Sequence, residues 1–154
     1  MTFGRSSHRL IMLAATLIGC ATGNTAQQST SASTMNTRAN EATLAQIYFW
    51  RAKPGKVEEY TRYIRERAEP IDAEAQRSGA FVSVTTYMAS DTTVPWTHMR
   101  VFTLRDSTQL RGLSEALTAA GVRLEPDSVK RRQQSEYSAT LRDRVGAVVA
   151  ELVR

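Results

Sequence analysis

Three short runs of mainly apolar residues predict three strands in the folded part of the chain. They are residues 44–51, 80–88 and 96–104, and each is rich in branched and aromatic side chains. The first run stops before Pro54-Gly55, which is a turn signal. The loop 89–95 joins the other two runs as a hairpin with a long connection.

Apolar residues at spacings of three and four predict a helix between the first two strands. The pattern extends over residues 57–75, and the opposite face carries charged residues. Pro54 suits the first turn of such a helix, because its missing N–H is not needed there. Pro70 lies inside the pattern and is expected to kink or interrupt the helix near Glu66. Ser78-Gly79 supplies the stop signal.

Two further helices are predicted after the third strand. Asp106 is a candidate N-cap, with Gln109 three residues on as in a capping box, and this helix is expected to end at Gly121. The next helix is expected to begin at Pro126, with Asp127 in its first turn. One face of that helix would carry Val129, Gln133, Tyr137 and Leu141.

The last stretch, residues 145–153, is short, branched and continuously apolar, which is typical of a strand or of the end of a long helix. Taken as a fourth strand, it completes the order β-α-β-β-α-β. This order is the split β-α-β, or ferredoxin-like, unit. The predicted fold class is therefore α+β, a ferredoxin-like split β-α-β sandwich with an added C-terminal helix.

Several segments resemble the dimeric α/β-barrel superfamily, which includes antibiotic-biosynthesis monooxygenase-like and NIPSNAP-like proteins. They are IYFW in the first strand, PGKVEEY after it, SGAF before the second strand, and the strand 96–104 followed by a short helix. The resemblance covers residues 44–120, and the segment 122–142 departs from the minimal fold. It implies a dimeric α/β barrel, with a pocket between the sheet and its helices or within the barrel.

Alternation along the first strand indicates that both faces of the sheet need cover. Ile47 and Phe49 point to one face, while Tyr48 and Trp50 point to the other. A sheet with one wet face would instead alternate apolar and polar residues. The helices cover one face, and a second copy of the chain would cover the other as a homodimer. The alternative is a monomer in which the segment 122–154 folds over the open face.

The N-terminus has the anatomy of a secretory signal. Basic residues precede an apolar run, residues 10–18, which is shorter than the roughly 20 apolar residues of a bilayer-spanning helix. The run closes as Leu17-Ile18-Gly19-Cys20, which resembles the lipobox of bacterial lipoproteins. The resemblance implies cleavage before Cys20, acylation of that residue, and membrane attachment through it. The alternatives are an ordinary signal peptide cut elsewhere and a buried helix.

The predicted domains are a lipoprotein signal peptide (1–19), a lipidated cysteine with a disordered tether (20–42) and a ferredoxin-like domain (43–154). The tether consists mostly of small and polar residues that cannot form a core. As a flexible coil of about 20 residues it reaches roughly 25 Å. The predicted location is the bacterial cell envelope, facing the periplasm or the exterior. Ala21 stands after Cys20, where resemblance implies that Asp would favour the inner membrane, so the outer membrane is favoured if the organism is Gram-negative.

The charge balance of the chain argues against a nucleic-acid partner. The 154 residues carry a formal net charge of +5, and removal of residues 1–19 takes two arginines and lowers it to +3. A charge of this size indicates solubility. Glu58-Glu59 is interpreted as a solvated helix face. Lys130-Arg131-Arg132 is interpreted in the same way, with contact to anionic lipid as the alternative.

Candidate chemistry centres on the third strand. His98 and Arg100 are two residues apart and project to one face, which Tyr48, Trp50 and Tyr87 would also line as a pocket. In such a pocket His98 would bind haem or accept a proton from a phenol-like substrate. The alternative is that His98 and Arg100 lie near a strand end or edge, solvated or paired with carboxylates.

The sequence shows no further catalytic or metal-binding pattern. Cys20 is the only cysteine, and one histidine remains after the signal is removed, so no spacing of metal ligands exists. Gly-rich phosphate loops and Ser/His/Asp sets are also absent from the sequence. No catalytic residue, metal or cofactor is assigned.

The predicted function is that of a lipid-anchored envelope protein, a non-enzymatic dimeric domain that binds a small ligand or a protein neighbour. This interpretation needs no catalytic residue. One alternative is a cofactor-independent enzyme that resembles the antibiotic-biosynthesis monooxygenases and acts on a small aromatic substrate with His98 as base. The other is a haem-binding protein that uses His98 as a ligand.

Overall fold

A computed structural model describes residues 41–153, so the predicted signal peptide, Cys20 and nearly all of the predicted tether lie outside the described residues. Within residues 41–153 no helix is long and apolar enough to cross a membrane. The elements in chain order are β1 (Leu44–Ala52), α2 (Val57–Tyr63), the π-helix η1 (Ile64–Ala68), α3 (Glu69–Arg77), β2 (Ser83–Met88), β3 (His98–Leu104), α4 (Ser107–Leu124), α5 (Ser128–Leu141) and β4 (Arg142–Glu151).

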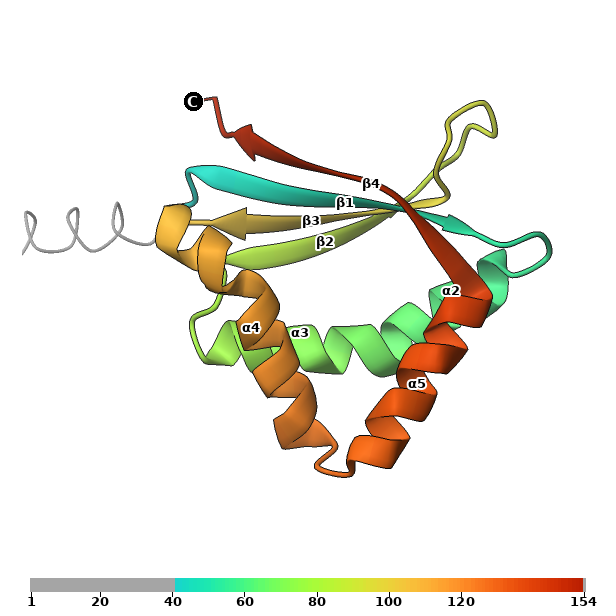
Figure 1. Cartoon of the computed structure of the whole chain (residues 1–154). Coiled ribbons are helices and arrows are strands. Elements are labelled where there is room, and N and C mark those ends of the chain that lie inside the picture. The colour runs from blue at the N-terminus through green and yellow to red at the C-terminus, as the bar shows by residue number, and fades with distance from the viewer. Residues whose placement is uncertain (1–40, 154) are drawn as a thin grey trace, which may run out of the picture.

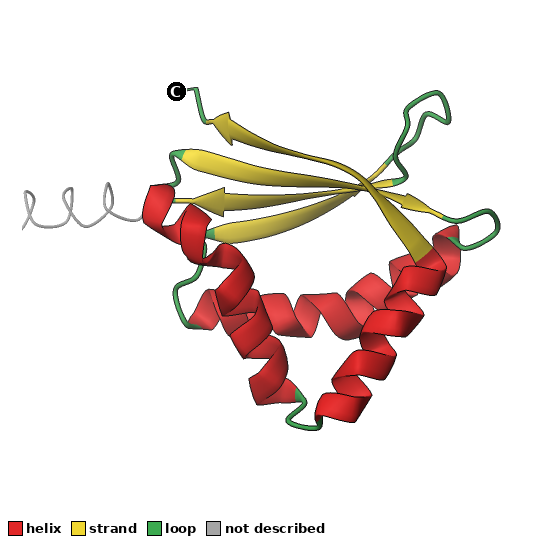
Figure 2. Cartoon of the chain, viewed as in Figure 1, coloured by secondary structure: helices red, strands yellow, loops and turns green. Residues whose placement is uncertain are grey.

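The four strands form one antiparallel sheet in the order β2-β3-β1-β4, and the helices lie together on one side of it (Figure 1 and Figure 2). The central strands β1 and β3 come from different halves of the chain, so the two halves interleave. This is the split β-α-β topology. The predicted ferredoxin-like α+β class, with an added helix before the last strand, is confirmed.

The apolar C-terminal stretch is a strand and not the end of a helix. β4 pairs with β1 along the length of β1, and Val148 lies opposite Ile47. The strand begins at Arg142 rather than at residue 145, and it ends at Glu151. The earlier start brings Arg142 and Arg144 into the sheet beside β1.

Pro70 interrupts the first long helix, as predicted. Residues Ile64–Ala68 form a π-helical turn between α2 and α3, and the N–H of Glu69 bonds to the carbonyl of Ile64. Pro70 has no N–H to donate to the carbonyl of Glu66, four residues earlier, so a regular α-helix cannot continue through this point.

Aspartate side chains cap both later helices. The carboxylate of Asp106 accepts hydrogen bonds from two N–H groups of the first turn of α4, at 2.8 and 3.0 Å. Asp127 caps α5 in the same way. The prediction that α5 begins at Pro126 is therefore wrong by two residues, because Asp127 is the N-cap and not a member of the first turn. The predicted end of α4 at Gly121 is also wrong, since the helix continues to Leu124.

Strands β2 and β3 are shorter than predicted. β2 begins at Ser83 rather than at residue 80, and Phe81, which precedes the strand, is buried in the core against Phe102. β3 begins at His98 rather than at residue 96. Both differences concern the ends of elements, where the apolar pattern continues into the adjoining loop.

The predicted apolar face of α5 is only partly buried. Leu141 is fully buried, but Val129 and Tyr137 are 48% and 44% exposed. α5 packs through its C-terminal end, and its N-terminal half reaches away from the sheet (Figure 1). α5 lies with the other helices and β4 lies in the sheet, so the segment 122–153 does not fold over the open face.

Two buried clusters hold the helices against the sheet. The larger contains Ala75, Phe81, Phe102, Leu104, Leu113 and Ala120, from α3, the loop before β2, β3 and α4. The smaller contains Ala52, Tyr60, Ile64 and Leu141, where α2, η1 and α5 meet the end of β1. Tyr48 packs on the larger cluster and Trp50 on the smaller, so the helix-facing residues of β1 connect the two.

The sheet face that points away from the helices is largely apolar. Tyr48 pairs with Arg100 on the helix side, so the neighbours of these residues point the other way. The residues on this surface, which we name the open face, include Ile47, Phe49, Tyr87, Met99, Val101 and Val148. Tyr87 and Val148 are about half exposed, and the others are partly buried. Both faces of β1 therefore carry apolar side chains.

Candidate functional site

Four of the five predicted pocket residues share the helix-facing side of the sheet. Tyr48 lies opposite Arg100, and Trp50 lies opposite His98, on the adjacent central strands β1 and β3. Directly opposed residues of an antiparallel pair project to the same face. The register of the two central strands therefore places these four side chains next to one another.

Tyr87, the fifth residue, lies on the open face. It is opposite Met99, whereas its neighbours Thr86 and Met88 are opposite Arg100 and His98. The expectation that Tyr87 shares a face with His98 is wrong. Which sheet face a residue points to depends on how its strand pairs with the neighbouring strand. Alternation of apolar and polar residues within one strand does not reveal that register.

A cleft of about 280 Å³ lies between the helix-facing side of the sheet and the helices α2, η1 and α4. Most of the large side chains that line it are aromatic rings and guanidinium groups. They are Tyr48, Trp50, Tyr60, Tyr63, Phe102, Arg100, Arg142 and Arg144. We name it the aromatic–arginine cleft. An adjoining hollow of about 520 Å³ shares several of these residues and extends the space toward α5.

Arg142 is a half-buried cation in this cleft without a carboxylate partner. Its guanidinium carbon lies 3.4 Å from the centroid of the Trp50 ring and 5.4 Å from that of Tyr60, as in cation–π contacts. Its Nε donates a hydrogen bond to the buried Ser138 Oγ at 3.0 Å. Burial lowers the pKa of Arg142, but an arginine remains protonated at neutral pH. Among residues 41–153, no Asp or Glu forms an ion pair with it.

Arg100 is neutralised by Asp72. The two side chains form an ion pair beneath the helices, where they are 12% and 5% exposed. Burial raises the pKa of Asp72, and the charge of Arg100 opposes that rise. Arg100 also lies 5.2 Å above the ring of Phe102. The pair fixes the position of Arg100 at the wall of the cleft.

Arg144 lies at the exposed side of the cleft. Its guanidinium carbon is 4.9 Å from the centroid of the Tyr48 ring. No carboxylate of the described residues forms an ion pair with it. The cleft thus gathers three guanidinium groups, of which only that of Arg100 is paired with a carboxylate, Asp72, among residues 41–153.

His98 is a buried neutral residue rather than a lining residue of the cleft. It is 1% exposed, and its ring lies edge-on to Tyr60 with centroids 4.6 Å apart. Its Nε2 is 3.0 Å from Thr61 Oγ1, and its Nδ1 is 2.9 Å from Thr97 Oγ1. Burial lowers the pKa of His98. The expectation that His98 is solvated or paired with a carboxylate is wrong. Inside the fold, each of its two ring nitrogens lies within hydrogen-bond distance of a threonine hydroxyl group.

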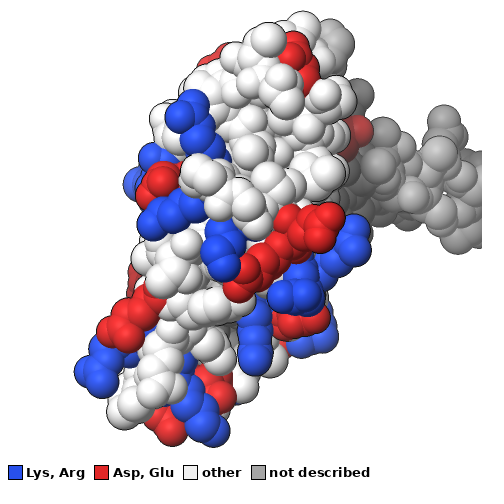
Figure 3. All heavy atoms as spheres, turned by 90° about the vertical axis from the view of Figure 1, so that its right-hand side faces the viewer, with Lys and Arg blue, Asp and Glu red and all other residues white. Residues whose placement is uncertain are grey.

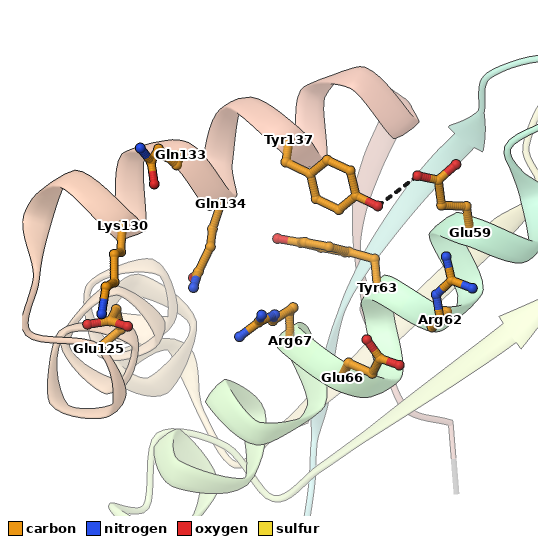
Figure 4. Close-up of a pocket in the computed structure, with 10 residues that line it drawn as sticks. All are labelled: Glu59, Arg62, Tyr63, Glu66, Arg67, Glu125, Lys130, Gln133, Gln134 and Tyr137. Atoms are coloured by element: carbon orange, nitrogen blue, oxygen red, sulfur yellow. Dashed lines mark hydrogen bonds between the residues drawn. The ribbon is translucent and has the colours of Figure 1, made fainter.

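A second, more polar groove separates α5 from the first helix. Figure 4 shows Tyr137 and Gln134 of α5 facing Tyr63 and Arg67, with the hydroxyl of Tyr137 donating to Glu59 at 2.7 Å. The residues that line this groove include three acids and three bases, so their charges balance. Acidic and basic side chains also lie side by side over the helical part of the face in Figure 3. We interpret this groove as a solvated surface where α5 lies beside the first helix.

The part of the chain that the structure describes contains no group of three or more His, Cys, Asp and Glu side chains placed to hold a metal ion. The cleft offers aromatic rings and guanidinium groups, which hold organic anions rather than metal cations. This set of guanidinium groups and rings is suited to contact with a small organic anion.

Comparison with known proteins finds several solved structures that are similar to this chain. No family model and no curated protein matches this chain. Similar structures are HapK from Hahella chejuensis, a dimeric protein of unknown function and ferredoxin-like fold from Bacteroides fragilis, and a dimeric ferredoxin-like protein from an uncultured marine organism. Their identities are 12%, 13% and 13%, and their TM-scores are 0.49, 0.49 and 0.46. The matches cover 71%, 73% and 75% of this chain and 92%, 98% and 96% of those chains.

Sequence reasoning missed the residues that give the cleft its charge. Arg142 and Arg144 precede the apolar stretch and look like a polar linker in the sequence. Asp72 lies on a charged helix and gives no sign that it is buried. One signal was available: Arg142 and Arg144 are two residues apart, which is the spacing of side chains on one face of a strand.

We predict that His98 makes the stability of the fold depend on pH. The pKa of His98 in the folded state is lowered from its ordinary value of 6.5, so the unfolded state takes up a proton first as the pH falls. The contribution of neutral His98 to stability is complete above pH 6.5 and is lost as the pH falls through the lowered pKa. Urea unfolding at about pH 7.5 and about pH 5.5 measures this loss.

His98→Gln is the control for this prediction, because glutamine keeps a donor and an acceptor but does not titrate. The unfolding free energy of the variant is expected to fall less between the two pH values than that of the parent protein. An equal fall in both proteins contradicts the prediction. If the variant does not fold, an NMR titration of the His98 ring in the parent protein tests the lowered pKa directly.

Proposed function

We propose that this chain is a lipid-anchored envelope protein whose domain binds a small ligand in the aromatic–arginine cleft, as a homodimer. The observation that carries the ligand-binding part is the half-buried guanidinium of Arg142, stacked on Trp50 without a carboxylate partner among residues 41–153. A buried arginine with a purely structural role would be paired with a carboxylate, as Arg100 is with Asp72. A mainly apolar cleft with a few fixed polar groups is the usual form of a small-molecule site.

Binding without catalysis is the function that these groups support best. A cofactor-independent monooxygenase-like enzyme needs a base beside its substrate, and His98 does not line the cleft. Burial raises the pKa of Tyr60 to about 12, so this phenol keeps its proton. Asp72 is tied to Arg100. Haem binding has less support, because both ring nitrogens of His98 lie within hydrogen-bond distance of threonine hydroxyls.

Fluorescence of Trp50 tests ligand binding. The chain has two tryptophans, and Trp96 packs on Phe49 outside the cleft, so Trp96→Phe leaves one reporter in the site. A panel of neutral and charged aromatic compounds of one or two rings is expected to include compounds that shift or quench this emission. A panel without any saturable response contradicts the proposal.

A matched pair of substitutions locates the response. Thr118 lines the cleft, and its neighbour Ala119 is exposed on the same helix without lining it. Thr118→Phe fills part of the space and is expected to weaken binding about tenfold or more. Ala119→Phe is expected to leave binding unchanged. Equal effects of the two variants would place the ligand elsewhere.

The lipid anchor is proposed from the sequence alone. Cys20 ends the string Leu17-Ile18-Gly19-Cys20 after a short apolar run, and the segment that follows is polar. Several acyl chains on one cysteine hold a protein far more firmly than one chain, since each buried methylene contributes about 0.8 kcal/mol. Envelope location depends on this anchor.

We predict that Cys20→Ser releases the protein from the membrane. Expressed as the full chain in a Gram-negative bacterium, the parent protein is expected in the membrane fraction, with an acylated N-terminal cysteine by mass spectrometry. The serine variant is expected in the soluble fraction, since serine cannot take the thioether-linked lipid. An unprocessed N-terminus, or equal membrane retention of both proteins, contradicts the anchor.

A homodimer is proposed because the open face is apolar and no helix of residues 41–153 covers it. The side chains of Ile47, Phe49, Met99 and Val101 form a continuous strip along the two central strands. The segment 122–153 lies on the helix side or in the sheet and does not cover this strip. A second copy of the same face is the simplest cover, because two-fold symmetry lets one apolar surface bury itself.

Val101→Glu tests the dimer. Val101 lies in the central strand β3 on the open face, so a charge there would be buried between two copies. In the Cys20→Ser background, the parent is expected to sediment with about twice the mass of one chain and V101E with the mass of one chain. Val122→Glu is the control, because Val122 is 42% exposed on α4. A monomeric parent protein contradicts the dimer.

A further inference from the structure

The charge of the aromatic–arginine cleft is the feature that identifies its ligand class. Two of its three guanidinium groups, those of Arg142 and Arg144, have no ion pair with a carboxylate of residues 41–153. Arg142 is also the more buried of the two. A charge held away from water is stable only with a counter-charge or full hydrogen bonding. The electrostatics of the cleft therefore favour a negatively charged ligand.

The contacts of Arg142 leave a defined edge for such a charge. Its Nε is committed to Ser138 Oγ, and the Trp50 ring covers one face of the guanidinium plane. The Tyr60 hydroxyl is a further neighbour of this guanidinium. A guanidinium fixed by stacking and by one hydrogen bond is pre-organised to hold a planar carboxylate through parallel N–H···O bonds.

The remaining walls define the other end of the ligand. The rings of Tyr48 and Phe102 are in edge contact at 5.9 Å between centroids, and the ring of Tyr63 lies on the helix side. Flat apolar walls of this kind favour an aromatic ring over a polar or branched group. The cleft of about 280 Å³ limits the ligand to a small size. Arg144 at the exposed side adds positive potential where the ligand enters.

We propose that the ligand is a small aromatic carboxylate, with its carboxylate on Arg142 and its ring against Tyr48 and Tyr63. This inference rests on the proposed function, since it names the ligand of the same cleft. Ser138 and Trp50 act as positioning residues that hold the guanidinium. The part of α5 that supplies Ser138 belongs to the segment added to the minimal fold, so the specificity is a property of this chain.

Matched pairs of acid and amide test the charge requirement. The probes are benzoate with benzamide and 2-naphthoate with 2-naphthamide, titrated into the full chain in its Cys20→Ser form and followed by calorimetry. Each acid is expected to bind roughly tenfold or more tightly than its amide, because charge-assisted hydrogen bonds to Arg142 replace neutral ones. The preference is expected to shrink as salt is raised.

Arg142→Gln tests the residue itself. The variant is expected to lose the preference, so that it binds the acid and the amide about equally. Arg142→Lys keeps the charge without the planar fork and is expected to restore part of the preference. Arg132→Gln is the control, because Arg132 is an exposed arginine on α5 outside the cleft, and it is expected to have no effect.

The outcomes separate the inference from the proposed function. If amides bind as tightly as acids, and Arg142→Gln changes neither, the carboxylate inference is overturned while a small-ligand site remains. If no aromatic probe of either kind binds, both are overturned. If Arg142→Gln does not fold, the acid-to-amide comparison in the parent protein and the Arg142→Lys variant still decide the question.

Discussion

The pairing of β4 with β1 is the interaction on which the candidate site depends. Phe49 lies opposite Gly146, but the next residue, Trp50, lies opposite Arg144, so β4 contains one extra residue at this point. In an unbroken ladder Arg144 would face Arg51 on the open side. The bulge instead turns Arg144 and Arg142 toward the helices, where they meet Tyr48 and Trp50. One irregular residue thus decides whether Arg142 and Arg144 line the cleft.

The helical wall of the cleft depends on a second irregularity. The π-helical turn Ile64–Ala68 supplies two lining residues, and Asp72 follows it by one turn. Asp72 is then placed to pair with Arg100 from the middle of the sheet. This ion pair and the two core clusters hold the helices against the sheet. Arg142 therefore has a fixed position, and its charge is available to a bound ligand.

Local signals in the sequence predicted what is local in the structure. The interruption at Pro70 and the aspartate cap of α4 each follow from a few neighbouring residues, whereas the apolar last stretch was compatible with a strand or with the end of a helix. Face assignments between strands do not, since they depend on register. Tyr87 was for that reason assigned to the wrong face, and the bulge that turns Arg142 and Arg144 toward the helices leaves no mark in composition or spacing. His98 was misjudged because the two threonines that satisfy it come from separate elements.

The sheet separates the three proposed roles in space. The proposed ligand binds on the helix-facing side of the sheet and the proposed dimer contact uses the open face. Neither interaction therefore blocks the other. The proposed anchor joins the domain just before Leu44, at the opposite end of β1 from Ala52. Trp50 is six residues along that strand, which is about 20 Å from the point of attachment. A membrane-held domain can therefore pack its open face against a second copy and still present Arg142 and Arg144 to small anions in the surrounding solution.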